Sequence, residues 1–226
     1  VDEDDHEHGH VHNGAEEATT YVVCSLCGEG KTAIARVLLK ELQSATVIVS
    51  DLPAARRAVP KKAGAFEIKE YTTESPQQQG LHQNAVVICH DLARPSRVAA
   101  AMASANRKIR LLTVLDARSF LDDWESPETL PSGLRKAAKG DKRAHLLGKK
   151  ACEVLAEHVE TADVIALSHA DDADTDELEM LEAMLSELNP SAIILRRTGD
   201  GAGGGKLLLR VAQASSDLPV PAERGG

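Results

Sequence analysis

Short, continuous apolar runs recur along the chain, with longer stretches of helical periodicity between them. The runs are rich in β-branched residues and do not alternate with polar ones, which is typical of parallel strands buried on both faces. They are Tyr21 to Cys24, Ala45 to Ser50, Ala85 to Cys89, Ile109 to Leu115, Val164 to Leu167 and Ala192 to Leu195. We therefore expect these segments to form one buried sheet.

Apolar residues spaced three or four positions apart predict helices between these strands. The predicted helices run from the Gly-Lys-Thr sequence at 30–32 to Leu42, through an Ala-rich stretch ending near Asn106, from Ala144 to Val159, and along a leucine stripe from Leu178 to Leu188. Because strands and helices alternate, the pattern predicts an α/β fold: a doubly wound, mostly parallel sheet with helices on both faces.

Other stretches give weaker signals. We expect Leu52 to Asn84 to hold a weak strand and a long mobile excursion, and the charged stretch Arg118 to Lys142 to be a loop. Leu207 to Val211 is a candidate for a short added strand. The acidic residues around Asp171 and Asp174 precede a helical pattern, where acidic side chains favour the helix start.

The composition fits one domain with polar ends. The chain has 226 residues with 42% hydrophobic but only 2% aromatic content, so its core should be aliphatic. We place an acidic, His-rich flexible segment at 1–18, the domain at 19–200, and a Gly-rich linker and tail at 201–226. A net charge of −9 argues against nucleic acid as a partner, and no apolar run is long enough to span a membrane.

The cysteines and the first residue indicate the cellular compartment in which the chain is expected to occur. The 4 cysteines are too scattered for a disulfide framework and fit a reducing environment. Because the sequence starts with Val1 rather than Met, we expect a processed or excerpted chain. The expected location is the cytoplasm or, after processing, the interior of an organelle.

A phosphate-binding loop is predicted between the first strand and the first helix. Gly28, Gly30, Lys31 and Thr32 match the end of the pattern G-x-x-x-x-G-K-[ST], in which backbone N–H groups and the lysine hold phosphates and the hydroxyl binds Mg²⁺. Ser25 replaces the first glycine, and Glu29 adds a carboxylate. The alternative is an ordinary strand–turn–helix joint without a ligand.

The start of the chain is rich in histidine. His6, His8, His10 and His12 alternate among acidic residues, and neutral imidazoles at that density form a loose site for Zn²⁺ or a similar ion. An equally good interpretation is a solvated acidic linker that chelates metal only incidentally.

The order of motifs from Tyr21 to Thr198 resembles the CobW-like GTPases, a P-loop family of metal-insertion proteins. The family's loop aligns with Ser25 to Thr32, and its E-x-x-G-L-A-x-P segment with Ile88 to Pro95. Its V-V-D-A-x-x-F, A-D-V-I-x-L-N-K-A-D and Leu-Asn-Pro segments align with 114–120, 162–171 and 188–194. The resemblance implies a P-loop NTPase-like fold that binds GTP and Mg²⁺ and delivers zinc, or a related metal, to a client protein that requires it.

The sequence differs from the family at positions that read the base and contact the phosphate. Ser168 and His169 replace the Asn-Lys pair that supports guanine, which leaves Asp171 as the base-reading residue. Ile88 replaces the acidic residue and Asp91 replaces the glycine whose backbone meets the γ-phosphate. These changes favour weak GTP hydrolysis, so the sequence keeps open a catalytically inactive pseudo-GTPase that serves as a binding or regulatory module. A P-loop ATPase or kinase is a third possibility.

Two smaller groups of residues each allow more than one interpretation. Cys24-x-x-Cys27 could form a redox pair or half of a zinc site, but no second cysteine pair completes it. His90 and Asp91 could act as an acid–base pair at a strand end, or be ordinary polar loop residues.

Overall fold

The structure is a computed structural model that describes residues 18–26, 28–42, 44–49, 56–60, 65–70, 83–91, 93–103, 108–128, 150–196 and 208. These residues form a 7-stranded sheet in the order β3-β2-β4-β1-β5-β6-β7, and every neighbouring pair is parallel. The strands are β1 (Thr19–Ser25), β2 (Ser44–Val49), β3 (Ala65–Glu70), β4 (Ala85–Ile88), β5 (Lys108–Asp116), β6 (Val164–Ser168) and β7 (Ile193–Arg196).

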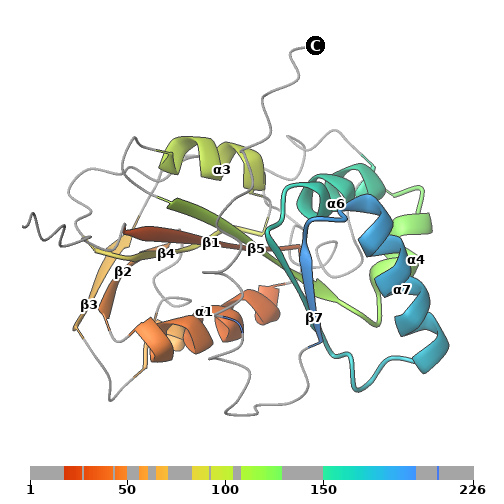
Figure 1. Cartoon of the computed structure of the whole chain (residues 1–226), viewed down its shortest axis with the longest axis horizontal. Helices are drawn as coiled ribbons and strands as arrows, with labels where there is room; N and C mark the ends of the chain where they lie inside the picture. Colours follow the sequence, from red (N-terminus) through yellow and green to blue (C-terminus); the bar gives the residue numbers. More distant parts are fainter. Residues whose placement is uncertain are drawn as a thin grey trace, which may run out of the picture.

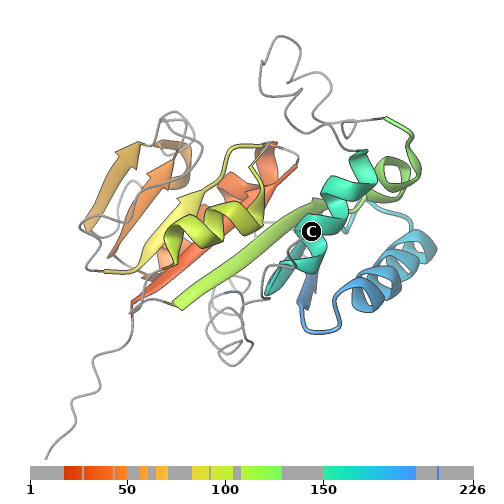
Figure 2. The same ribbon diagram turned by 90° about the horizontal axis from the view of Figure 1, so that it is seen from above.

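Helices cover both faces of the sheet. Helix α1 (Gly28–Leu42) lies on one face, and α3 (Pro95–Met102) and α6 (Ala151–Glu160) lie on the other (Figure 1). Helix α7 (Thr175–Leu188) packs with α6 over the β6 end of the sheet (Figure 2). The predicted doubly wound α/β fold is therefore confirmed.

The core is aliphatic, as the low aromatic content predicts. On the α1 face, Ile34, Leu38 and Leu39 of the helix pack against Tyr21, Val23 and their neighbours in the sheet. On the other face, Val98 and Met102 of α3 cover Val22, Ile48 and Val87. Burial of a leucine-sized side chain contributes about 1.5–3 kcal/mol, so these layers hold the strand ends in fixed positions.

The ends of α7 also agree with the sequence pattern. The side chain of Asp174 accepts a hydrogen bond from the backbone N–H of Asp176 at 2.9 Å and caps the first turn. At the other end, the amide of Asn189 donates to the carbonyl oxygens of Val159 and Ala162 at 2.8 and 2.9 Å. Asn189 thereby joins the end of α7 to the end of α6.

One predicted loop contains a helix. The stretch from Arg118 was expected to be irregular, but α4 (Phe120–Glu125) begins two positions later. Its 6 residues are too few to show a periodic pattern, and the helix is held by tertiary packing of the buried Phe120 in the same core cluster as Val154 and Leu155 of α6. Within the helix, the Phe120 and Trp124 rings stack at a centroid distance of 5.7 Å. Residues 129–149, which include the start of the predicted Ala144 helix, lie outside the described residues.

The predictions for the weak segments have mixed outcomes. The weak strand within 52–84 is present as β3, and residues 56–58 of the expected excursion are helical. Residues 52–55, 61–64 and 71–82 lie outside the described residues. Leu208, in the stretch expected to add a strand, is helical and is buried against the α1-face core. None of the helices that the structure describes has the length and apolar content needed to cross a bilayer.

Candidate functional site

The first turn of α1 lies at the carboxyl end of β1, in the middle of the sheet. Strand β1 ends at Ser25 and α1 begins at Gly28, so only residues 26 and 27 separate the two elements. The sequence predicted the strand to end at Cys24 and the helix to begin with the Gly-Lys-Thr sequence at 30–32, so the observed connection is shorter than expected. The first backbone N–H groups of a helix have no partners within the helix and attract anions, and α1 places its start at this edge of the sheet.

Helix α1 lies so close to the sheet at position 30 that only a glycine fits there without strain. A Cβ atom at this position would lie 2.7 Å from Cγ1 of Val114 in β5 and 3.7 Å from Oγ of Ser168 in β6. The first of these distances is too short for any side chain without movement of Val114. The glycine therefore lets the start of α1 lie directly against β5.

Lys31 is largely buried and is held by a carboxylate from the neighbouring strand end. Its Nζ forms an ion pair with Oδ1 of Asp91, and the two side chains are 8% and 26% exposed. Asp91 Oδ1 is buried and accepts no hydrogen bond from the described residues, so the ammonium is what compensates its charge. We call Lys31, Asp91 and the first turn of α1 the Lys31 corner.

Strand register explains why Asp91 reaches Lys31. Val23 of β1 pairs with Ile88 of β4, and the backbone N–H of Cys89 donates to the Val23 carbonyl at 3.0 Å, one residue beyond the paired segment. The chain therefore leaves β4 beside the start of α1 and places Asp91 there. Sequence reasoning noted the charge of Asp91 but missed its contact with Lys31, which joins residues far apart in the sequence.

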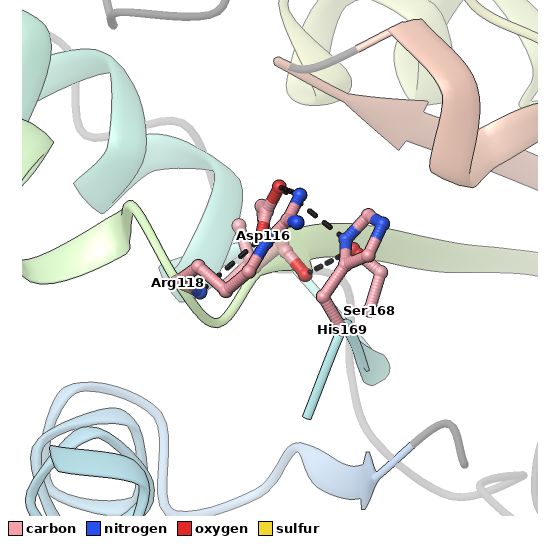
Figure 3. A network of polar contacts seen from close by, with 5 residues as sticks. Asp116, Arg118, Ser168 and His169 are labelled. Carbon is pink, nitrogen blue, oxygen red and sulfur yellow. Dashed lines mark hydrogen bonds and ion pairs between the residues drawn. The ribbon is translucent and has the colours of Figure 1, made fainter. Parts of the chain in front are cut away.

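A second polar group lies at the ends of β5 and β6. Asp116 accepts from the Arg118 side chain at 3.2 and 3.0 Å and pairs with Nδ1 of His169 at 3.3 Å (Figure 3). Ser168 Oγ donates to the carbonyl of Leu115 at 3.0 Å, which ties β6 to β5. We call Asp116, Arg118, Ser168 and His169 the Asp116 corner.

The Asp116 corner has two unusual features, the pKa of Asp116 and the backbone conformation of His169. Burial alone would raise the pKa of Asp116, but the hydrogen bonds from Arg118, with His169 adding to them, lower it below its usual value. His169 has a φ of 56°, a left-handed conformation that is uncommon outside glycine. That backbone turns the His169 side chain toward Asp116.

The two corners meet at Gly30, since the glycine approaches Ser168 while the next residue holds Asp91. Thr32 follows on α1 and is partly exposed, and Asp171 is exposed in the turn after β6. The predicted residues Gly30, Lys31 and Thr32 thus stand together on one helix start, and Asp171 stands at the end of β6.

The cysteine pairing differs from the sequence alternative. Cys24 has its Sγ 3.2 Å from that of Cys89 on the adjacent strand, and both residues are buried. The hydrogen bond with Cys89, followed by burial, raises the pKa of Cys24 well above its usual value, which makes it a poor nucleophile and metal ligand. Cys27 lies outside the described residues.

A buried histidine lies behind the Lys31 corner. His158 of α6 is buried, and neither ring nitrogen has a hydrogen-bond partner among the described residues. Burial, with a smaller contribution from Lys31, lowers its pKa to about 4, although Glu157 and the nearby backbone of Ala93 act in the opposite direction. His158 is therefore neutral at pH 7.

The segment after Asp91 is anchored to α6. Arg94 donates from Nε to both Glu157 oxygens at 3.1 and 3.0 Å, and Ser96 Oγ donates to Oε1 at 2.8 Å. The sequence did not indicate this contact, because Arg94 stands at an unspecified position of the aligned segment and Glu157 belongs to no motif. The anchor holds the turn that carries Asp91 against the second layer of helices.

No metal centre is found among the described residues, which contain no group of three or more His, Cys, Asp or Glu side chains suited to one ion. His6, His8, His10 and His12 lie outside the described residues.

No protein-family model matches the chain. Among solved structures, the chain is similar to the crystal structure of hydrogenase maturation factor HypB from Archaeoglobus fulgidus, with 14% identity and a TM-score of 0.47. The similarity covers 85% of this chain and 88% of that one. At this level it carries no conclusion about activity, and the fold described above rests on the sheet order itself.

Proposed function

We propose that this chain is a guanine-nucleotide-binding domain of the P-loop type, used as a binding module with little or no GTP hydrolysis. The observation that carries the proposal is the largely buried Lys31 at the start of α1, paired with a carboxylate. An ammonium in this position suits a phosphate. In this structure its charge is satisfied by the carboxylate of Asp91, which is negative as a phosphate is.

The residues present fit a nucleotide in part. The N–H groups at the start of α1, the Lys31 ammonium and the Thr32 hydroxyl are the donor set that a diphosphate or triphosphate needs. Mg²⁺, when bound, would neutralise phosphate charge, and Thr32 is the residue that would hold it. Asp171, exposed at the end of β6, is the group that would accept hydrogen bonds from guanine.

The arrangement does not fit efficient hydrolysis. Ile88, which stands where the CobW-like family has an acidic residue, is 2% exposed and packs into the α1-face core, so it offers nothing to water or metal. Asp91 adds a negative charge beside the lysine that should stabilise phosphate charge. Removal of one well-placed donor typically costs about 10²–10³ in rate, which favours the inactive binding module.

Zinc delivery is the second candidate function, and the run His6, His8, His10 and His12 favours it. In this case the metal is cargo for a client protein that requires it, and nucleotide binding gates the transfer. Deletion of residues 1–14 should then remove Zn²⁺ binding measured by calorimetry. Tight binding of one equivalent by the shortened chain would contradict a metal site in this segment.

The proposed function is tested by nucleotide titration together with a turnover assay. With Mg²⁺ present, the full chain should bind guanine nucleotides more tightly than adenine nucleotides and release phosphate from GTP at close to the background rate. Equal affinity for GTP and ATP would point to the P-loop ATPase or kinase alternative. Robust GTP turnover that Lys31→Ala abolishes would overturn the binding-module proposal.

A further inference from the structure

Cys24 and Cys89 form a buried pair of thiols between two central strands. The register of β1 and β4, which pairs Val23 with Ile88, sets Cys24 against Cys89 at the next position, and both pack in the core on the α3 side. Their Sγ atoms are 3.2 Å apart, and each residue is 1% exposed. Neighbouring strands lie about 4.8 Å apart, within the range of roughly 4.4–6.8 Å that a disulfide spans between Cα atoms. The fold therefore holds two free thiols at a separation that a disulfide can bridge.

We propose that Cys24 and Cys89 are a modification site, at which hydrogen peroxide forms a reversible disulfide that joins the ends of β1 and β4. The inference goes beyond the proposed function and is independent of it, because it requires no nucleotide. The cysteine motif of the sequence would pair Cys24 with Cys27 instead. The two pairings give different products in the same experiment, so they can be told apart.

The surroundings of the pair decide which sulfur reacts first and with which oxidant. The hydrogen bond with Cys89, followed by burial, raises the pKa of Cys24 and keeps its proton in place. Cys24 donates this hydrogen bond, so Cys89 can lose its own proton without breaking the contact. Cys89 is therefore the sulfur that attacks the oxidant. Because both thiols are buried, the oxidant must be small and uncharged, as hydrogen peroxide is.

The oxidation balances with one molecule of hydrogen peroxide. Cys89 Sγ attacks a peroxide oxygen, so that an S–O bond forms, the O–O bond breaks, and the thiol proton leaves with the released hydroxide as water. Cys24 Sγ then attacks the sulfenic sulfur of Cys89. The S–S bond forms, and the hydroxyl group leaves with the Cys24 proton as a second water. Cys24 is a poor nucleophile, but contact between the sulfurs compensates for this because the second step is intramolecular.

The disulfide would link the two chain segments that build the Lys31 corner. Strands β1 and β4 lie side by side in the middle of the sheet (Figure 1). Cys24 is followed by the start of α1, and Cys89 is followed two positions later by Asp91. Lys31 is close enough for its charge to act on Cys24, whose pKa it lowers against the larger effects that raise it. Oxidation thus places a covalent link beside the ion pair of Lys31 with Asp91.

Peroxide treatment of the reduced full chain, followed by alkylation, digestion and mass spectrometry, tests the inference. In native buffer the peptides that carry Cys24 and Cys89 should be recovered linked, about tenfold or more in excess over a Cys24–Cys27 product, and dithiothreitol should restore both thiols. In urea this preference should disappear, because Cys27 is then the nearest thiol along the chain to Cys24. Oxidised glutathione, which is larger and charged, should form the link more slowly than peroxide in native buffer.

Variants identify the sulfurs that take part. Cys24→Ser and Cys89→Ser should each abolish the link, and Cys89→Ala is the further variant in case a serine disturbs the core. Cys27→Ser should keep the link, which separates Cys24 from its neighbour in the same peptide. Cys152→Ser, at a half-exposed position of α6, is the matched control and should also keep it.

Urea unfolding of the oxidised chain reports whether the disulfide fits the fold. The link joins residues 65 positions apart and restricts the unfolded chain, so the midpoint of unfolding should rise on oxidation and return after reduction. A Cys24–Cys27 disulfide as the main native product, or two thiols that still alkylate after peroxide, would overturn the inference. It would also be overturned by a link that forms equally well in urea, or by one that lowers the midpoint, because the fold would then not favour the pair.

Discussion

The Lys31 corner and the Asp116 corner lie side by side at one edge of the sheet, and their charged groups are satisfied in different ways. In the Lys31 corner a largely buried lysine pairs with one acidic side chain, Asp91. In the Asp116 corner one carboxylate, Asp116, pairs with two side chains, those of Arg118 and His169. One corner is thus a single buried ion pair, whereas the other is a more exposed network.

This difference indicates where ligand binding should be sensitive to mutation. The partners in the Lys31 corner are largely buried, so their charges interact strongly. In the Asp116 corner the Arg118 and His169 side chains are 47% and 39% exposed, so solvent screens their contacts. We therefore expect the affinity for any nucleotide to depend mainly on the Lys31 corner and its choice of base on the turn beside the Asp116 corner.

The largest effect is expected from Lys31→Ala. Loss of the ammonium leaves both the phosphates and the buried Asp91 oxygen without a positive partner, so nucleotide affinity should fall by about 100-fold or more. Calorimetric titration with GDP measures the change. Lys40→Ala, at an exposed position in the last turn of the same helix, is the control and should bind normally. Equal affinities in the two variants would remove the Lys31 corner from the site.

Acid should weaken the structure behind the Lys31 corner. The pKa of His158 is about 4 in the folded chain, below its ordinary value of 6.5, so between these values the unfolded chain binds more protons. The free energy of unfolding should therefore fall as pH drops from 6.5 toward 4, by about 2–3 kcal/mol at pH 4.5. Urea unfolding at pH 7 and pH 4.5 measures this difference.

The variant His158→Leu provides the check on that prediction. A leucine cannot titrate, so the part of the pH dependence due to His158 should disappear. The remaining dependence would come from carboxylates such as Asp116, whose lowered pKa removes stability only at more acidic pH. An unchanged difference between pH 7 and pH 4.5 in His158→Leu would rule out the histidine as its source.

Gly30→Ala tests the contact between the two corners. In an open helix position this change would stabilise by up to about 1 kcal/mol, but here the new Cβ would lie 2.7 Å from Val114 Cγ1. We expect a net loss of about 1–2 kcal/mol in the free energy of unfolding. In the Val114→Ala background the same glycine change should cost less, because the obstructing methyl is gone. A stabilised Gly30→Ala variant would contradict the close packing.

The smallest effect is expected from Asp171→Asn. Asp171 is exposed and lies outside the buried contacts, so overall stability and phosphate affinity should change little. The preference for guanine over adenine nucleotides should fall by roughly tenfold, because an amide cannot accept from both guanine donors. Asp172→Asn, the exposed neighbour, is the matched control. Identical preferences in the two variants would move base recognition elsewhere.

The fold was predictable because its signals are local. Each buried strand is a continuous apolar run, and helices such as α1 and α7 repeat their apolar residues with helical spacing. Helix α4 was missed because it is short and depends on tertiary contacts, including the packing of Phe120 in the core cluster with Val154 and Leu155 of α6.

The candidate site was predictable only in its individual residues. The motif identified Lys31 and the resemblance identified Asp91 as a departure, but their contact depends on the pairing of β1 with β4. The same holds for Cys24 and Cys89, whose proximity comes from adjacent strand ends and not from a cysteine motif. Strand order, which brings such residues together, leaves no local trace in the sequence.

The central place of β1 has a consequence for how the chain folds. Thr19 to Ser25 pair with β4 and β5, so this strand gains its neighbours only after residues up to Asp116 are available. During synthesis from the amino end, an early apolar segment must remain unpaired while about a hundred later residues emerge, at a typical rate of about 5–20 residues per second. Such delayed, long-range pairing slows folding and leaves the apolar β1 segment exposed to aggregation until its neighbours are available.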